Sequence, residues 1–291
     1  MNFDNNYNLQ VSGVRLGKEG GLFFRCYGKS GLNSTIPDRT YIVSSENKVN
    51  TLVRTIDDEI VAIEIIGLNA LVSVGIYGDV YEYQKGRWID KDFEINPAEA
   101  LSRTIVMDDV LYIVGTGNTF MMLSDDGWVP VCEELSKAEE VDLYGLCYDA
   151  GNEFVVCGER GFVAKVSKIT IEKFNVPTNT DINNVVSIRS GLVAICGNKG
   201  VLFVGYGDQW ADYSMPDLGL DFTSVISWNG EVYVSAKDCI FILGKEGLEL
   251  FEDIQSFNLI GVGDEMWSIG INCIYKYDGS LWEKVIIAFE S

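Results

Sequence analysis

Histidine is absent from this chain of 291 residues, and its absence excludes several kinds of catalytic site. A Ser-His-Asp or Cys-His arrangement uses an imidazole as its general base. The nucleophile phrase G-x-S-x-G and the phosphate-binding phrase G-x-x-x-x-G-K-[ST] do not occur. The seven cysteines are scattered without a C-x-x-C pair, so no zinc site is expected. We therefore expect no catalytic residues, no metal and no cofactor, while the many carboxylates leave glycoside chemistry open.

Long apolar runs are also missing. The run at 61–75 is interrupted by Glu64, Gly67 and Asn69, so no membrane span is predicted. The residues MNFDNNYNLQ at 1–10 lack the basic and apolar regions of a secretory signal, and none is expected. Most cysteines lie in apolar stretches, which is typical of buried thiols in a reducing compartment. We expect a cytoplasmic protein.

Basic residues are scarce relative to acidic ones. The chain has 22 Lys and Arg against 43 Asp and Glu, a net charge of −21 and a pI near 4.3. A binder of nucleic acid must neutralise phosphates with Lys and Arg, so no nucleic-acid partner is expected. The acidity has two interpretations: it keeps the protein soluble, or it steers a basic protein partner toward one face.

The chain does contain a repeated phrase. It consists of an apolar run, a small residue, two variable residues, a second small residue and another apolar run. Six copies occur at steps of 34 to 43 residues, and a period near 40 indicates a repeat architecture. The first small positions are Gly75, Gly115, Gly158, Gly197, Ala236 and Gly270, and the second are Gly78, Asn118, Gly161, Gly200, Cys239 and Cys273. Turn signals flank each copy, as at Asn229-Gly230, so each unit is predicted to hold four short strands, A to D.

Four-stranded units of this length predict an all-β fold, a single β-propeller over residues 1–291. Six regular blades account for residues 60–291. Residues 1–59 then form an irregular first blade, which repeats the phrase at Gly17 and Gly20 and carries an insertion around 30–38. Seven blades are therefore favoured over six. Glycine or Asn118 is expected to supply positive φ at the turn between strands B and C.

These repeats resemble a known family. The stretches LVSVGIYGDVYEYQKGRW (71–88) and LVAICGNKGVLFVGYGDQW (192–210) are similar to the photosystem II assembly-factor-like propellers and to bacterial neuraminidase (BNR) repeats. The resemblance implies a propeller whose B–C turns open on one face. It brings no catalytic residues with it, because the Asp-box S-x-D-x-G-x-x-W is nowhere intact and SDDGW at 124–128 comes closest.

The B–C turns differ from one another at their two middle positions, while the frame around them repeats. Loops on a rigid scaffold commonly carry recognition, so these positions are candidate partner-binding residues; the alternative is that nothing constrains them. The candidates are Tyr77, Glu159, Arg160, Asn198, Lys199, Lys237, Asp238 and Asn272. Acidic runs are either solvated surface or partner-binding patches. These are Asp57, Asp58, Glu59, Glu133, Glu134, Glu139 and Glu140.

The function predicted from these features is non-enzymatic protein binding. In its sharpest form, the chain is an acidic cytoplasmic inhibitor or immunity protein that occludes a basic protein such as a toxin. The alternatives are an assembly or scaffold factor and a propeller that acts on or binds carbohydrate. A closed propeller has few free strand edges, so we expect a monomer.

Overall fold

The structure is a computed structural model that describes residues 8–16, 21–29, 39–46, 49–67, 70–93, 95, 100–271 and 273–286. The insertion predicted at 30–38, Gly17 and Gly20 lie outside these residues. The fold divides into two compact units. The terminal unit is Met1–Asp92 with Ile260–Ser291, and the central unit is Phe93–Leu259.

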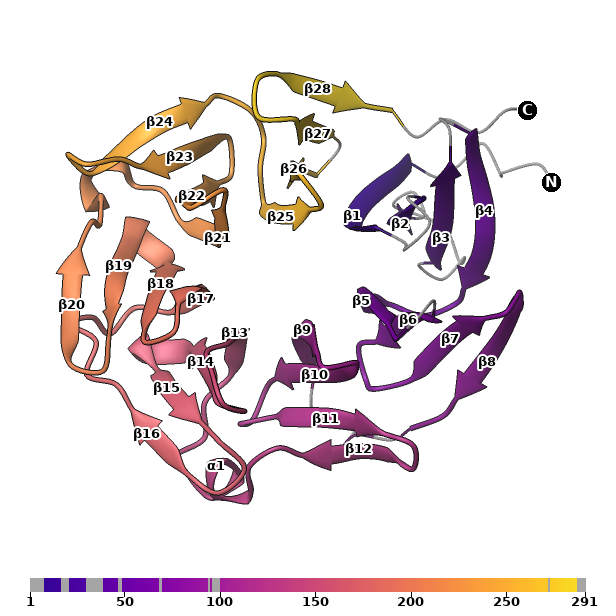
Figure 1. Cartoon of the computed structure of the whole chain (residues 1–291), viewed down its shortest axis with the longest axis horizontal. Coiled ribbons are helices and arrows are strands. Elements are labelled where there is room, and N and C mark those ends of the chain that lie inside the picture. Colours follow the sequence, from indigo (N-terminus) through magenta and orange to yellow (C-terminus); the bar gives the residue numbers. More distant parts are fainter. Residues whose placement is uncertain are drawn as a thin grey trace. The chain divides into compact units, whose positions relative to one another are not determined.

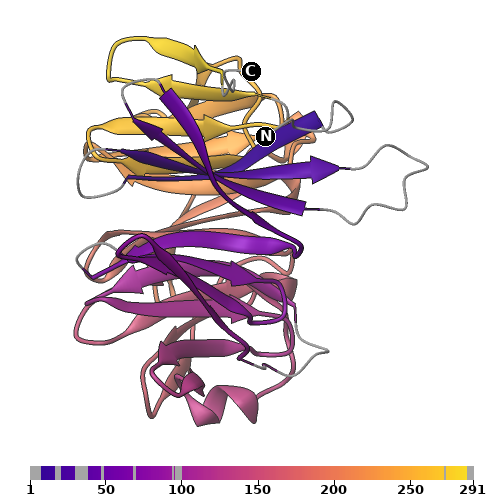
Figure 2. The ribbon, with the colours of Figure 1, turned by 90° about the vertical axis from the view of Figure 1, so that its right-hand side faces the viewer.

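Three four-stranded sheets belong to the terminal unit, with the boundary between the units falling inside β25. Their strands are β1 (Asn8–Leu16), β2 (Leu22–Lys29), β3 (Arg39–Glu46) and β4 (Val49–Ile56); β5 (Ile60–Ile66), β6 (Ala70–Gly75), β7 (Val80–Gln84) and β8 (Arg87–Lys91); β25 (Asn258–Val262), β26 (Glu265–Ile269), β27 (Ile274–Tyr277) and β28 (Trp282–Val285). Figure 1 labels these strands, and in Figure 2 the strands β1–β4 cross one another because the sheet is twisted.

Four further sheets make up the central unit. Their strands are β9 (Leu101–Met107), β10 (Val110–Gly115), β11 (Phe120–Ser124) and β12 (Gly127–Pro130); β13 (Leu143–Tyr148), β14 (Phe154–Gly158), β15 (Val163–Val166) and β16 (Ile171–Lys173); β17 (Ile182–Arg189), β18 (Leu192–Gly197), β19 (Val201–Tyr206) and β20 (Gln209–Asp212); β21 (Phe222–Trp228), β22 (Glu231–Ala236), β23 (Cys239–Leu243) and β24 (Leu248–Glu252). The short helix α1 (Glu133–Ser136) lies between β12 and β13.

Every sheet follows chain order, and its strands pair as antiparallel neighbours. The fold class is therefore all-β, with the seven four-stranded blades of a β-propeller, and the prediction of seven blades rather than six is confirmed. No helix among the described residues is long and apolar enough to cross a membrane.

In each sheet of the central unit the second strand is the most deeply buried, and β14 shows why, because neighbouring sheets cover both of its faces. In β14 every residue is buried. Val156 packs in one cluster with Val114 of the preceding sheet, while the adjacent Val155 packs in another with Val193 of the following sheet. Since successive side chains of a strand point to opposite faces, an uninterrupted apolar strand fills both spaces at once.

A β-bulge interrupts the first strand of six sheets, and in five of them it comes directly after the first residue of the strand. Between β13 and β14 the pairing passes from Leu143 to Gly145, so that Tyr144 has no direct partner. The residues skipped in this way are Ser12, Val61, Ser102, Tyr144, Asn183 and Thr223. A bulge re-aims the side chain of the extra residue. In the central unit Tyr144 and Asn183 consequently reach the turn that follows the second strand of their own sheet.

Candidate partner-binding surface

We call the turn between the second and third strands of a sheet its tip. In three neighbouring sheets of the central unit, the tip has two consecutive residues with positive φ. They are Gly117 and Asn118, Arg160 and Gly161, and Lys199 and Gly200. The Phe162 N–H donates to the Glu159 carbonyl at 2.9 Å, which closes the turn around Arg160 and Gly161. Positive φ at both central residues defines a type I′ turn.

The two glycines of the repeated phrase act for different physical reasons. The second one has positive φ, 71° at Gly161 and 68° at Gly200, as predicted. The first does not, since Gly158 has a φ of −175°. Its requirement is space, because a Cβ there would strike the carbonyl oxygen of Asp142, and one at Gly197 would strike that of Asp181.

An aspartate just before the first strand of the next sheet holds each of these three tips. Asp142 accepts the Gly117 N–H at 3.0 Å, Asp181 accepts the Arg160 N–H at 3.0 Å, and Asp221 accepts the Lys199 N–H at 2.8 Å. We call these three residues the tip aspartates. The main-chain carbonyls of Asp142 and Asp181 also accept from Glu159 and Asn198, the first residues of their own tips. Two of the tip aspartates thus connect two tips each, which preorganises the surface.

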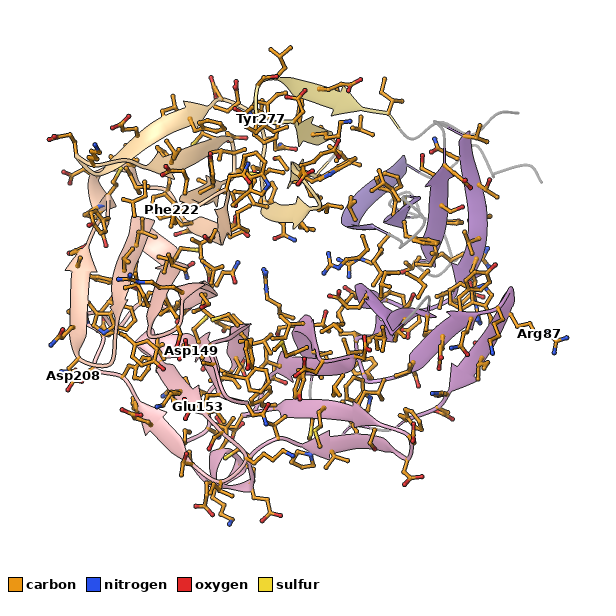
Figure 3. The ribbon with its side chains drawn as sticks, in the orientation of Figure 1. Arg87, Asp149, Glu153, Asp208, Phe222 and Tyr277 are labelled. Carbon is orange, nitrogen blue, oxygen red and sulfur yellow. The ribbon has the colours of Figure 1, made fainter. Side chains whose placement is uncertain are left out.

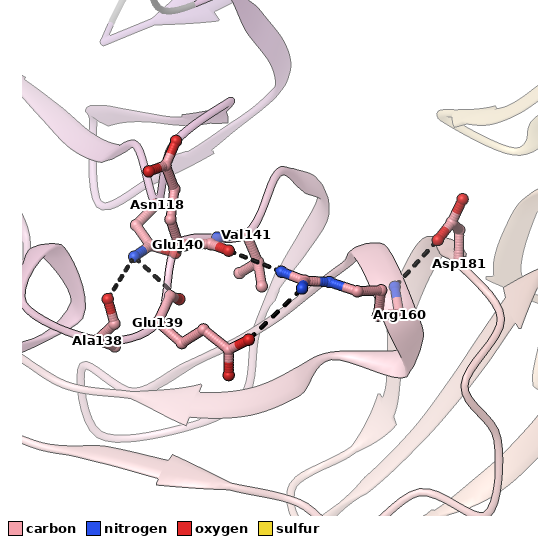
Figure 4. A network of polar contacts seen from close by, with 7 residues as sticks. All are labelled: Asn118, Ala138, Glu139, Glu140, Val141, Arg160 and Asp181. Carbon is pink, nitrogen blue, oxygen red and sulfur yellow. Dashed lines mark hydrogen bonds and ion pairs between the residues drawn. The ribbon is translucent and has the colours of Figure 1, made fainter.

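Asn118 is a buried support rather than a contact residue. It is 6% exposed, and its amide Nδ2 donates to the carbonyls of Ala138 and Glu139 at 3.4 and 3.3 Å. Its Oδ1 accepts the Val141 N–H at 3.0 Å (Figure 4). These bonds fix the segment between α1 and β13 against the tip of the β9–β12 sheet.

Arg160 extends over that same segment. Its Nη2 donates to the Glu140 carbonyl at 2.8 Å, and its Nη1 lies 3.4 Å from Glu139 Oε1 (Figure 4). The side chains of Arg160 and Glu139 are 57% and 78% exposed. An ion pair between such exposed groups adds little to stability, so both charged groups remain accessible at the surface.

On the tip of the β17–β20 sheet, the charged Lys199 lies beside a short helix that exposes the apolar Leu218. The bulge residue Asn183 donates to Asn198 Oδ1 at 2.9 Å and thereby orients the first tip residue. The exposed Lys199 follows. The Met215 N–H donates to the Gly200 carbonyl at 2.8 Å, so the short 3-10 helix Pro216–Leu218 packs against this tip. Leu218, within it, is 42% exposed.

The carboxylates around these tips create a negative electrostatic environment, which affects the pKa of the Tyr144 hydroxyl. Burial, together with the nearby carboxylates of Glu159, Asp181 and Asp142, raises the pKa of Tyr144 to about 12. Its hydroxyl donates to Glu159 Oε1 at 3.5 Å. A negative potential of this kind favours the approach of a positively charged protein.

The sequence-predicted residues divide between the two units. Glu159, Arg160, Asn198 and Lys199 lie on neighbouring tips of the central unit, and the structure brings Glu139 and Glu140 to Arg160. Further candidates of the same unit are the exposed Lys237 and Asp238 on the tip of the β21–β24 sheet and the exposed Glu133 and Glu134 in α1.

The remaining candidates belong to the terminal unit. Tyr77 is 54% exposed on the tip of the β5–β8 sheet, where the Ile76 N–H donates to the Glu59 carbonyl at 2.8 Å. Asp57 forms an ion pair with Arg39, and Asp58 accepts from the Tyr81 hydroxyl at 3.2 Å. The acidic run Asp57, Asp58 and Glu59 therefore accompanies the tip of its own sheet. Asn272 lies outside the described residues.

Sequence reasoning did not identify the tip aspartates or the bulge residues Tyr144 and Asn183. The aspartates had a detectable signal, since Asp142, Asp181 and Asp221 recur at the repeat period immediately before a first strand. The bulge had none, because it depends on strand register.

At the end of the β13–β16 sheet away from its tip, an acidic residue accepts hydrogen bonds from the following sheet. Asp149 and Glu153 lie at the β13–β14 hairpin (Figure 3). Asp149 accepts from the Tyr206 hydroxyl at 2.6 Å and from the Gly191 N–H at 2.9 Å. Within the part of the chain that the structure describes, no group of three His, Cys, Asp or Glu residues is arranged to hold a metal ion.

Charge is distributed unequally between the units. The central unit has 26 Asp and Glu against 10 Lys and Arg, a net −16, whereas the terminal unit has 17 against 12, a net −5. Most of the acidity detected in the sequence thus belongs to the sheets whose tips are fixed by aspartates.

The fold and this surface define the class, a β-propeller whose predominantly acidic central unit presents rigid, charged and polar tips. No family model matches the chain. The immune protein Tsi7 of Pseudomonas aeruginosa is 30% identical over 114 residues, which are 38% of this chain and 37% of Tsi7. The chain thus matches little more than a third of the length of that relative.

Solved structures agree on the fold. The WD40 β-propeller domain of Doa1 superposes with a TM-score of 0.70 at 11% identity, over 94% of this chain and 97% of that one. YCF48 from Cyanidioschyzon merolae gives 0.69 at 8% identity, over 94% and 96%. YCF48 bound to D1 peptide gives 0.57 at 10% identity, over 78% and 81%. The resemblance to photosystem II assembly-factor-like propellers is thereby confirmed at the level of repeat and fold.

Proposed function

We propose that this chain is a non-enzymatic protein-binding propeller that serves as a cytoplasmic immunity protein and occludes a basic protein such as a toxin. The observation that carries the proposal is the stretch of 114 residues shared at 30% identity with an immune protein. The net charge of −16 on the central unit supports a basic partner, since opposite charges accelerate association and favour the correct encounter.

The tips supply the contact surface in this proposal. Their backbones are fixed by the tip aspartates, so little conformational entropy is lost when a partner binds. Occlusion of a toxin requires a rigid surface whose charge is opposite to that of the toxin, and no catalytic group takes part.

A tagged copy of the chain expressed in its native host tests the proposal. We expect one basic protein to co-purify in stoichiometric amount and to dissociate as salt rises from about 0.05 to about 0.5 M, because screening weakens contacts between exposed charges. Mass spectrometry identifies it. Expressed alone in a naive host, that protein should arrest growth, and co-expression of the chain should restore it.

Three results would contradict the proposal. Capture of subunits of a larger complex without toxicity would favour the assembly-factor alternative. A partner held equally at high salt would remove the electrostatic argument. If no protein were captured, a glycan-binding screen would test the carbohydrate alternative.

A further inference from the structure

Two basic residues on the tips have a backbone conformation that is unfavourable for their type. Eight non-glycine residues in the described part of the chain have positive φ, and five of them are Asn or Asp, which tolerate it. The other three are Lys85, Arg160 and Lys199. Arg160 and Lys199 occupy the same position of type I′ turns in neighbouring sheets, where the preceding sheet has Gly117.

Neither side chain is needed to form its turn. The tip aspartates hold the backbone N–H groups of Arg160 and Lys199, and any residue supplies such a group. A type I′ turn prefers Asn, Asp or Gly at this position, and the glycine that follows is already present at both tips. Turn formation alone therefore favours a different residue at both positions, as it does at Lys85. The Arg160 side chain also binds the Glu140 carbonyl, whereas no hydrogen bond or ion pair from the described residues holds that of Lys199. What sets Arg160 and Lys199 apart from Lys85 is their place on adjacent tips, where loops of a rigid scaffold commonly carry recognition.

Lys199 also has an apolar neighbour on the same surface. Leu218 is 42% exposed in the 3-10 helix that packs against this tip. An exposed apolar side chain beside charged groups is the arrangement of protein interfaces, in which an apolar core is surrounded by a polar rim.

The charges of the two residues restrict the partner. Arg160 and Lys199 are cations on a unit of net charge −16, so they repel a basic protein unless it presents carboxylates opposite them. A repulsive contact against wrong partners is a common source of specificity. The remaining acids attract many basic proteins, and these two cations discriminate among them.

We propose that Arg160, Lys199 and Leu218 form the part of the surface that selects the partner. The two cations pair with carboxylates on an otherwise basic protein, and Leu218 enters an apolar pocket beside them. This inference rests on the proposed function, because it needs the protein partner described above.

The test measures binding to the purified basic protein that the wild-type chain captures in the experiment above. The variants are the double change Arg160→Asn with Lys199→Asn, and Leu218→Ser. Asparagine suits the type I′ turn, and this gain offsets the loss of the exposed Arg160 bond to the Glu140 carbonyl, so the thermal midpoint of the double variant should change little. We expect its Kd to weaken at least about tenfold and that of Leu218→Ser about fivefold, as for central interface residues.

Matched controls exist at the other ends of the sheets. Lys85 and Gly86 form the two-residue turn between β7 and β8, with φ of 52° and 78°. Lys85→Asn therefore removes the same charge from the same kind of turn, and it lies at the end of β7 away from the tip. Ile169, 80% exposed in the β15–β16 turn, provides Ile169→Ser as the apolar control. Both controls should bind within about twofold of wild type.

The possible outcomes separate the two proposals. If wild type captures a basic toxin and all variants bind it equally, the selecting surface is overturned while the proposed function stands. If wild type captures no basic protein, the proposed function fails and this inference fails with it. Lys199→Arg keeps the charge and should bind like wild type. If Lys199→Arg bound as weakly as the single variant Lys199→Asn, which is measured beside it, the carboxylate pairing would be wrong.

Discussion

The central unit and the terminal unit are built from the same four-stranded sheet, yet they present different tips. In the central unit the tips are charged or polar, and aspartates of the following sheet hold the backbones of three of the four. The terminal unit exposes apolar side chains on its tips, with Tyr77 at 54% and Ile271 at 42%. Its neighbouring sheets β1–β4 and β5–β8 are joined by a bidentate ion pair between Arg15 and Glu64, at 2.6 and 2.7 Å.

The difference shows that the repeated frame and the surface chemistry are set by separate residues. Small residues and strand register give each sheet its form. The tips then differ in charge and polarity without altering that form. The four predictions below test this comparison, beginning with the largest expected effect.

The first prediction compares Gly197→Ala with Gly75→Ala. The new methyl group at 197 strikes the main-chain carbonyl of Asp181, which cannot move without its strand. At 75 it meets the Asp58 carboxylate, a side chain that can rotate away. We expect a loss of unfolding free energy of about 3 kcal/mol for Gly197→Ala and about 1 kcal/mol for Gly75→Ala, measured with denaturant. Equal losses would contradict this assignment.

The second prediction removes one tip aspartate. Asp181→Ala deletes the acceptor of the Arg160 N–H and of Asn198 Nδ2, so we expect a loss of about 1 kcal/mol and faster amide exchange at Arg160. The control is Asp57→Ala in the terminal unit, whose ion pair with Arg39 is partly exposed and should cost under about 0.5 kcal/mol. Unchanged exchange at Arg160 would show that the hydrogen bond does not hold the tip.

The third prediction concerns charge. Glu133→Lys with Glu134→Lys reverses two exposed acids of the central unit, and Glu46→Lys with Glu283→Lys does the same in the terminal unit. We expect the association rate with the basic partner to fall about fivefold at low salt for the first pair and to change little for the second. Stopped-flow or surface-based kinetics would measure both. A similar fall for both pairs would mean that only total charge matters.

The fourth and smallest effect is the pH dependence at Asp79. Burial raises the pKa of Asp79, and the Asp58 and Asp92 carboxylates raise it further. The folded state then holds the proton more tightly than the unfolded state, so this group's contribution to stability is lost as pH rises through the raised pKa. We expect Asp79→Asn to stabilise the protein at pH 7 by a few tenths of a kcal/mol, reduced by solvent screening. The gain should vanish below the ordinary pKa of 3.8.

Asp278 provides a control of opposite sign for that measurement. Hydrogen bonds from the Leu281 N–H and from Ser280 lower the pKa of Asp278 to about 2. Its contribution is present at neutral pH and is lost as pH falls toward that value. Thermal unfolding of Asp278→Asn across pH 2 to 7 should therefore show a deficit at neutral pH that shrinks in acid. The same sign for both variants would contradict the assigned environments.

Much of the fold could be predicted from the sequence because the same residue types recur at the same places in each repeat of about 40 residues. Apolar strands recur, turns rich in Gly, Asn and Asp separate them, and Gly161 and Gly200 mark positive φ. Gly158 was predicted at the correct place for the wrong reason. Its neighbour is the Asp142 carbonyl of the adjacent strand, and a main-chain oxygen has no signature in the residue names.

The candidate surface was predictable only in part for the same reason. The tip residues could be found as variable positions inside a fixed frame. The tip aspartates could not be paired with them, because each accepts a backbone N–H from another sheet, and every residue except proline offers one. Tyr144 and Asn183 reach the tips through a bulge, which alters register without altering composition.

The bonds of the tip aspartates all run in one direction along the chain. Each tip is held by a carboxylate that lies 21 to 25 residues further toward the C-terminus. On the ribosome, a tip of the central unit therefore stays incomplete after its own strands have formed, until the start of the next sheet has been synthesised. Each of these three tips therefore gains its side-chain acceptor only once the first residues of the following sheet have been added to the chain.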